Sequence, residues 1–196
     1  MKKLLLLVGL IVGTWFVFHD APAGWRGMPA ARDPVQNAQG LPAAFTHDGY
    51  TIKPLATYNV SAVVLSRSRY RNDASSSLAP VDLALGWGPM SVASVINDLK
   101  ISQSGRWYEY SWSGEPPLDP TSIAVHSANT HCLPATVEIR DRLLAIKRHE
   151  LVTLKGYLVE INGPKGYRWL SSLTRDDTRG GACEVMWITS VDHHKI

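Results

Sequence analysis

The sequence has little of several features that would assign it to a class. It contains two cysteines, no internal repeat, and one long apolar run, at its start. The formal charge of +3 falls to +2 (18 basic against 16 acidic residues) when the charges of Lys2, Lys3 and Asp20 are left out with residues 1–23. That excess is too small to indicate nucleic-acid binding by itself. The 45% hydrophobic and 19% charged residues exclude a disordered chain, and 196 residues suit one domain with its own core.

The N-terminal residues have the pattern of an export signal. Lys2 and Lys3 precede an apolar run over residues 4–18, and a small-x-small site follows at residues 21–23. The run is at the upper end of a signal core (~7–15 residues) and short of a membrane span (~20 residues). Cleavage after Ala23 and retention as a single anchor on the periplasmic face of the inner membrane both remain open. Either outcome predicts export from a bacterial-type cytoplasm.

The remaining sequence predicts one domain behind a linker. Residues 24–48 are rich in Pro, Ala, Gly and Gln without a period, which is typical of a linker. Residues 49–192 form the expected globular domain, and residues 193–196 the expected frayed tail.

Alternating and periodic residues predict mostly strands with a few short helices. Strand patterns cover residues 50–53, 58–65, 106–112, 151–161, 167–172 and 182–191. Helical signals cover a turn at residues 80–85, a helix from an N-cap at Ser91 to about residue 99, one from Asp119 to Val125, and one from Thr136 to about Arg148. The expected fold is α+β and strand-dominated, a small antiparallel barrel of the OB-like or SH3-like kind with two or three short helices.

Export changes how the two cysteines are interpreted. In an oxidising compartment an even number of cysteines suggests a bridge. A Cys132–Cys183 disulfide would close a loop of about fifty residues and contribute ~3–4 kcal/mol in the chain-entropy model. Two buried thiols, or one reactive thiol, are the alternatives.

The densest polar cluster lies at residues 126–132. His126 and His131 are five residues apart, so a helix would not place them on one face, but a loop could bring them together with Asn129 as an orienting group. Cys132 adds a thiol for Cys/His chemistry. Catalytic candidates are therefore His126, Asn129, His131 and Cys132. No cofactor or metal site is expected, and the two histidines are the candidate ligands if a metal does bind. A polar loop between two helices, with the histidines bonded to backbone, is the alternative.

Aromatic and basic residues supply the candidate binding surface. Seven Trp and seven Tyr against three Phe favour half-buried faces with a polar handle. The candidate binding residues are Trp87, Arg106, Trp107, Tyr108, Tyr110 and Arg175. Arg67, Arg69 and Arg71 alternate along an extended segment, where they could contact phosphate or anionic lipid, or keep a solvated strand edge charged.

Several segments together resemble an uncharacterised family of bacterial exported or membrane-tethered proteins. The resemblance covers about residues 50–191. Its segments are DLALGWGPMS (82–91), ISQS (101–104), RWY (106–108), HSANTH (126–131), GYLVE (156–160), SSLTR (171–175) and GACE (181–184). The family implies no activity. It implies that these segments belong together and that the loops around Trp87 and His126 are the places to look for a site.

Three functions follow as hypotheses. The first is a non-enzymatic envelope module that binds a partner protein or ligand in a groove lined by Trp87, Trp107, Tyr108 and Tyr110. The second is a metal-assisted or Cys/His hydrolase that uses residues 126–131. The third is a binder of anionic polymer on an OB-like face, with nucleic acid an improbable partner. If residues 4–18 are not cleaved, the membrane is a further partner.

Overall fold

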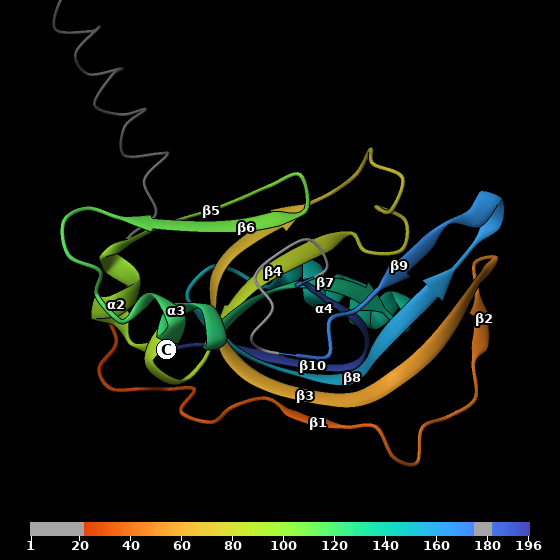
Figure 1. The fold of residues 1–196 in the computed structure, drawn as a ribbon, viewed down its shortest axis with the longest axis horizontal. Helices are drawn as coiled ribbons and strands as arrows, with labels where there is room; N and C mark the ends of the chain where they lie inside the picture. Colours follow the sequence, from red (N-terminus) through yellow and green to blue (C-terminus); the bar gives the residue numbers. More distant parts are fainter. Residues whose placement is uncertain (1–21, 175–181) are drawn as a thin grey trace, which may run out of the picture.

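The computed structural model describes residues 22–174 and 182–196, and strands make up most of this part of the chain (Figure 1). Residues 1–21 of the predicted export signal, and Arg175, lie outside the described residues. Within them, no helix combines the length and apolar character needed to cross a membrane.

Five long strands form the framework of the fold. They are β3 (Tyr50–Arg69), β4 (Val81–Gly86), β7 (Ser127–Pro134), β8 (Glu150–Asn162) and β10 (Glu184–Lys195). The other strands are β1 (Val35–Asn37), β2 (Phe45–His47), β5 (Leu99–Ser104), β6 (Trp107–Trp112) and β9 (Arg168–Leu170). The helices are α2 (Ala93–Asn97), α3 (Pro120–Val125) and α4 (Val137–Ala145), with 3-10 turns η1 (Gly88–Ser91) and η2 (Pro164–Gly166).

The five long strands form a ring. Each is hydrogen bonded to two others in the order β3-β4-β7-β10-β8 and back to β3, and every contact is antiparallel except that of β7 with β10. β3 reaches both neighbours because its first part pairs with β8 and its last part, from Val63, pairs with β4. α4 connects β7 to β8. The predicted strand-dominated α+β class is confirmed, and the five strands form a ring of pairings, not a true barrel, that resembles the OB-like alternative.

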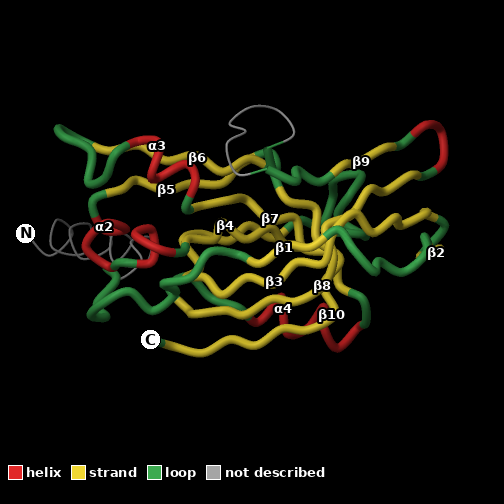
Figure 2. The backbone as a smooth tube through the Cα atoms, turned by 60° about the horizontal axis from the view of Figure 1, so that its bottom comes forward, coloured by secondary structure: helices red, strands yellow, loops and turns green. Residues whose placement is uncertain are grey.

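Apolar alternation along β3 accounts for the ring interior. Tyr58, Val60, Ala62 and Val64 are buried at every second position, and they pack with apolar side chains of β4, β8 and β10. A second apolar cluster lies under the β5–β6 hairpin, which Figures 1 and 2 show stretched across the outside of the ring beside β4 and β7. The hairpin therefore covers one outer face of the ring.

Two segments predicted as other structures are strands. Residues 80–85, expected as a helical turn, belong to β4, and residues 127–132, expected as a polar loop, belong to β7. Both strands are buried on their two faces, because the ring interior lies on one side and the hairpin and loops cover the other. A strand buried on both faces has no polar–apolar alternation, so its periodicity resembles that of a buried helix.

The predicted helix N-caps hold at two of three positions. The Asp119 carboxylate accepts hydrogen bonds from the backbone N–H groups of Thr121 and Ser122, and the Thr136 hydroxyl accepts one from Ile139 N. The prediction at Ser91 was wrong: α2 begins two residues later, because the Ser91 hydroxyl donates to Gly88 O inside the preceding 3-10 turn.

Both ends of the described chain pack on the ring. Within the predicted linker, β1 and β2 pair with β3, and Trp25 Nε1 donates to Ser91 O. Ala23 exchanges two hydrogen bonds with the Asn97 side chain. The expected tail continues β10, where Lys195 pairs with Glu150 of β8. Two short strands thus lie within the predicted linker, and residues 193–195 of the expected tail belong to β10.

Candidate binding cleft on the outer face of β4 and β7

A buried carboxylate lies at the centre of the outer face of β4. Asp82 has no exposed surface, and β-strand alternation places it opposite the neighbouring Val81 and Leu83, which face the ring interior. Burying an isolated carboxylate is costly, so its partners define the site. They are Arg106 from the hairpin and His131 from β7.

Arg106 reaches Asp82 from the tip of the β5–β6 hairpin. Gly105 and Arg106 form a two-residue turn in which both φ angles are positive, at 57° and 72°. A non-glycine residue in this region is strained by roughly 1–2 kcal/mol, so its side-chain contacts must stabilise the turn. Its Nη1 donates to Asp82 Oδ1 at 2.8 Å and to Ala79 O at 2.9 Å, and its Nε and Nη2 donate to the two oxygens of Asp73. The hairpin tip is therefore fastened to the β3–β4 loop and to β4.

Aromatic contacts complete the enclosure of Arg106. Its guanidinium lies 3.8 Å from the centre of the Tyr70 ring, and its backbone N–H donates to the Tyr70 hydroxyl. Burial by itself lowers the pKa of Arg106, but Asp73 and Asp82 outweigh burial and raise it. The same hydrogen bonds lower the pKa of Asp73. Arg106 is thus a cation shared by two carboxylates.

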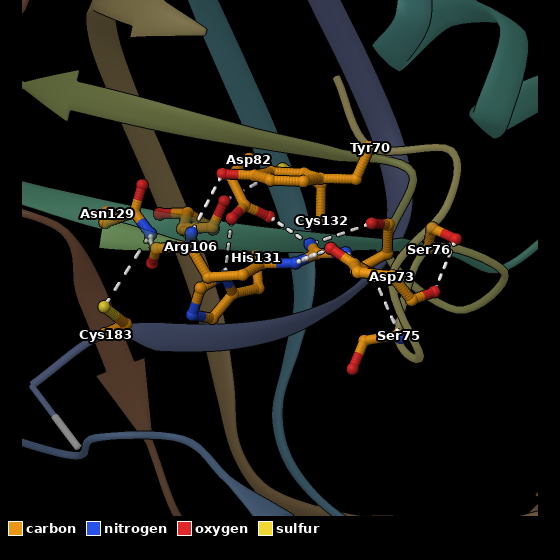
Figure 3. Close-up of polar contacts among 12 residues, drawn as sticks. Tyr70, Asp73, Ser75, Ser76, Asp82, Arg106, Asn129, His131, Cys132 and Cys183 are labelled. Atoms are coloured by element: carbon orange, nitrogen blue, oxygen red, sulfur yellow. Dashed lines mark hydrogen bonds and ion pairs between the residues drawn. The ribbon is translucent and has the colours of Figure 1, made fainter. Parts of the chain in front are cut away.

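His131 lies beside Asp82 because the two residues are directly paired across β4 and β7. His131 Nδ1 is 2.9 Å from Asp82 Oδ2, and the imidazole packs against the Trp169 ring at 4.6 Å between centroids. Two positions earlier on the same face, Asn129 Nδ2 donates to Arg106 O at 3.0 Å and lies 3.7 Å from Cys183 Sγ. Figure 3 shows these side chains gathered over β7.

Arg106 and His131 of this cluster line a cleft of about 500 Å³. The walls come from the β3–β4 loop, the hairpin tip and the segment between β8 and β10. The lining residues are Ser75, Arg106, Trp107, His131, Tyr167, Arg168, Trp169, Leu170 and Cys183. The second and third strands of the ring in chain order are β4 and β7, so the cleft lies over the face of these two strands, beside the β3–β4 loop and the segment between β8 and β10.

The positive charges at the cleft are balanced by neighbouring carboxylates. Arg168 Nε donates to Glu160 Oε1 at 2.7 Å, and this hydrogen bond lowers the pKa of Glu160. Arg106 is held by Asp73 and Asp82, as described above. The cleft therefore presents aromatic surface and hydrogen-bonding groups without an excess of positive charge.

The structure separates the predicted aromatic groove into different environments. Trp107 is 49% exposed and lines the cleft, whereas Trp87 is buried in the ring interior. Tyr108 and Tyr110 face the opposite side of β6 from Trp107 and pack under the hairpin, where burial raises the pKa of Tyr108. The groove predicted from these four residues was wrong, because alternation along β6 divides them between two faces.

The two candidate histidines also lie apart. His126 ends α3, where its Nδ1 is 2.8 Å from Ser122 O, and it lines a second recess of about 370 Å³ with Trp87. His131 lies in the cleft on β7. The described residues contain no group of three or more His, Cys, Asp or Glu side chains placed to hold a metal. The expected convergence of His126 and His131 in one loop was wrong, because β7 begins between them.

The cysteines do not approach each other. Cys132 pairs with Met186 in the β7–β10 ladder and faces the ring interior, while Cys183 precedes β10 and lines the cleft. They are not bridged, because three ladder positions and opposite faces of the sheet separate them. Burial, and then the nearby Asp82 charge, raise the pKa of the Cys132 thiol well above its usual value. Cys132 is therefore no longer a candidate nucleophile.

Sequence analysis did not identify Asp73, Asp82 or Trp169 as members of the site. Asp82 was detectable in principle, since it is the single charge in the apolar segment from residue 78 to residue 87. A charge there required either solvent or buried partners. Comparisons with protein-family models, curated proteins and solved structures found no match for this chain.

Proposed function

We propose that the protein is a cell-envelope binding module whose ligand lies in the cleft over β4 and β7. The observation that carries the proposal is the position of the cleft: it lies on the OB-like binding face and is lined by exposed Trp107, by Trp169 and by Tyr167. Large aromatic side chains left accessible in a cleft supply contact area at low conformational cost. The first hypothesis is thus retained with a different groove.

The charge balance favours an uncharged ligand over an anionic polymer. Arg106 and Arg168 already contact carboxylates, and Arg67, from the predicted basic run, lines a separate recess with Lys147 and Arg148. Arg106 is not available to a polyanion in the cleft, because the carboxylates of Asp73 and Asp82 already hold its guanidinium. Flat aromatic faces with neighbouring hydrogen-bond donors suit the alternating apolar and hydroxyl surfaces of a sugar chain, and OB-like faces do bind oligosaccharides. We therefore propose an uncharged oligosaccharide as the ligand class.

Export, and hence the envelope location, is proposed from residues 1–23. If the apolar segment 4–18 remains as an anchor, the domain lies close to the bilayer. Ala23 and Trp25 are already hydrogen bonded to the region of α2 and η1, which leaves a short connection between anchor and domain. A cleavage product would begin on the surface of the same domain.

The test is a tryptophan-fluorescence and NMR titration of the full chain with neutral oligosaccharides of increasing length and with a single-stranded oligonucleotide. We expect saturable binding of the oligosaccharide that changes little with salt, and at least about tenfold weaker binding by Trp107→Ala. Leu173→Ala is the matched control, because Leu173 is similarly exposed but lines the second recess. Binding that falls steeply with salt would favour the anionic-polymer hypothesis. Sensitivity to Leu173→Ala and not to Trp107→Ala would assign the ligand to the other recess.

A further inference from the structure

The cleft is lined by a thiol, Cys183, and by an imidazole, His131, that lies beside the carboxylate of Asp82. Cys183 lies immediately before β10, is half-buried and lines the cleft together with His131. The parallel ladder pairs Glu184 with Thr130 and Val185 with His131, so Cys183 comes beside Asn129. The contact from Asn129 Nδ2 to Cys183 Sγ, 3.7 Å, agrees with that register.

We propose that Cys183 is a nucleophilic thiol, with His131 as its proton acceptor and Asp82 as the group that orients the imidazole. This goes beyond the binding function and does not depend on it. The register places Cys183 and His131 two positions apart on neighbouring strands, and both side chains line the same cleft, so a rotamer change of either side chain can bring the imidazole to the thiol. A nucleophile, a base and an orienting group in this order form the general arrangement for covalent catalysis, and it is commonly looser without substrate.

The surroundings of His131 fix its orientation. Its side chain is 5% exposed, Asp82 lies at Nδ1, and Trp169 packs against the ring. The charged groups that face it are Asp82 from β4 and Arg106 from the hairpin. Arg106 contacts the other oxygen of Asp82, and Asp82 Oδ2 lies 2.9 Å from His131 Nδ1, where the carboxylate can orient the imidazole. Since Nδ1 lies beside Asp82, Nε2 is the ring nitrogen that we assign as the proton acceptor.

The chemistry that this arrangement supports is transfer of an acyl group from an ester on the bound ligand. The Sγ proton passes to His131 Nε2 while sulfur attacks the carbonyl carbon. The bond to the alcohol oxygen then breaks, and the leaving oxygen takes the proton from His131. Water hydrolyses the resulting thioester, which releases a carboxylic acid and restores the thiol. A sugar chain that carries an acyl ester would be both the ligand of the cleft and the substrate of this reaction.

Alkylation of the full-length protein by iodoacetamide, followed site by site with mass spectrometry across pH, tests the thiol directly. We expect Cys183 to react with a pH midpoint clearly below that of an ordinary cysteine, about 8.5. Cys132 is the internal control and should remain unlabelled in the folded protein, since it is fully buried. A Cys183 profile with an ordinary midpoint would overturn the proposal, and this measurement needs no variant.

Two further measurements assign the roles. His131→Gln should slow alkylation of Cys183 at neutral pH by about tenfold, and His126→Gln, which alters the histidine outside the cleft, should not. With p-nitrophenyl acetate as the probe, the wild type should release one equivalent of nitrophenol in a burst that Cys183→Ala abolishes. No burst would overturn acyl transfer. Oligosaccharide binding by Cys183→Ala tests the binding proposal separately, because removing the thiol leaves Trp107 and Trp169 in place.

Discussion

Arg106 is the residue on which the site depends most. It combines a strained backbone conformation with contacts to Asp73, Asp82 and Tyr70, and thereby connects the hairpin, the β3–β4 loop and β4. A residue held in a sparsely populated conformation indicates that its surroundings determine it. Because Asp82 is completely buried, the loss of Arg106 would leave an uncompensated charge in the protein interior.

Arg106→Gln should therefore lower the free energy of unfolding by about 3–5 kcal/mol at neutral pH. Arg168→Gln is the control, since Arg168 is 59% exposed and its ion pair with Glu160 contributes at most about 1 kcal/mol. Urea denaturation followed by circular dichroism measures both. Equal effects of the two substitutions would contradict a special role for Arg106.

The same experiment has a pH signature. The folded-state pKa of Asp73 is lowered by Arg106, so its contribution is fully present above the ordinary carboxyl range and is lost as pH falls through the lower folded-state pKa. The wild type should lose stability between about pH 4 and pH 2, and Arg106→Gln should lose less over this range. The difference in urea midpoint between the two proteins should therefore narrow in acid. Because Asp73 is partly exposed, this narrowing should be a small part of the stability difference between the two proteins at neutral pH.

At the scale of elements, the sequence predicted some parts of the site and missed others. It predicted the hairpin strand β6 and two helix caps, and it missed the ring strands β4 and β7. Alternation over residues 106–112 predicted β6, and the Asp119 and Thr136 caps predicted α3 and α4, because these signals are local. β4 and β7 were missed since burial on both faces removes alternation. Their position between the ring interior and the hairpin depends on residues far along the chain, and so does the assembly of Asp82, Arg106 and His131.

The cap of α4 gives a test at this scale. Thr136 satisfies one of the N–H groups that a helix leaves unpaired at its start, so Thr136→Ala should cost about 1 kcal/mol of unfolding free energy. The neighbouring Val137→Ala is the control, because Val137 is 74% exposed and its loss should change stability by less than about 0.5 kcal/mol. Thermal and urea unfolding would measure both. A Thr136→Ala protein as stable as the wild type would show that α4 is held by packing alone.

At the scale of the molecule, closure of the ring explains why residues 193–195 are part of a strand. β10 lies between β7 and β8, so the parallel contact that completes the ring is made by the last strand of the chain. Figures 1 and 2 place the C-terminus at the end of the molecule that carries α2. A terminal segment without a local strand pattern is predicted as a frayed tail. Its structure is instead determined by pairing with a strand that is distant in the sequence.

The C-terminal residues therefore test the ring as a whole. His193 Nδ1 lies 2.8 Å from Glu150 Oε2 at the start of β8, and the ladder continues to the Lys195–Glu150 pair. Removal of residues 193–196 deletes these hydrogen bonds and should lower the unfolding free energy by about 1–3 kcal/mol. His193→Ala should reproduce part of the loss, while His194→Ala, which alters an exposed neighbour, should not. Hydrogen exchange would locate the change at the start of β8 and the end of β10. If the truncated protein retains full protection there, closure of the ring ends before His193, and the last residues are the frayed tail that the sequence predicted.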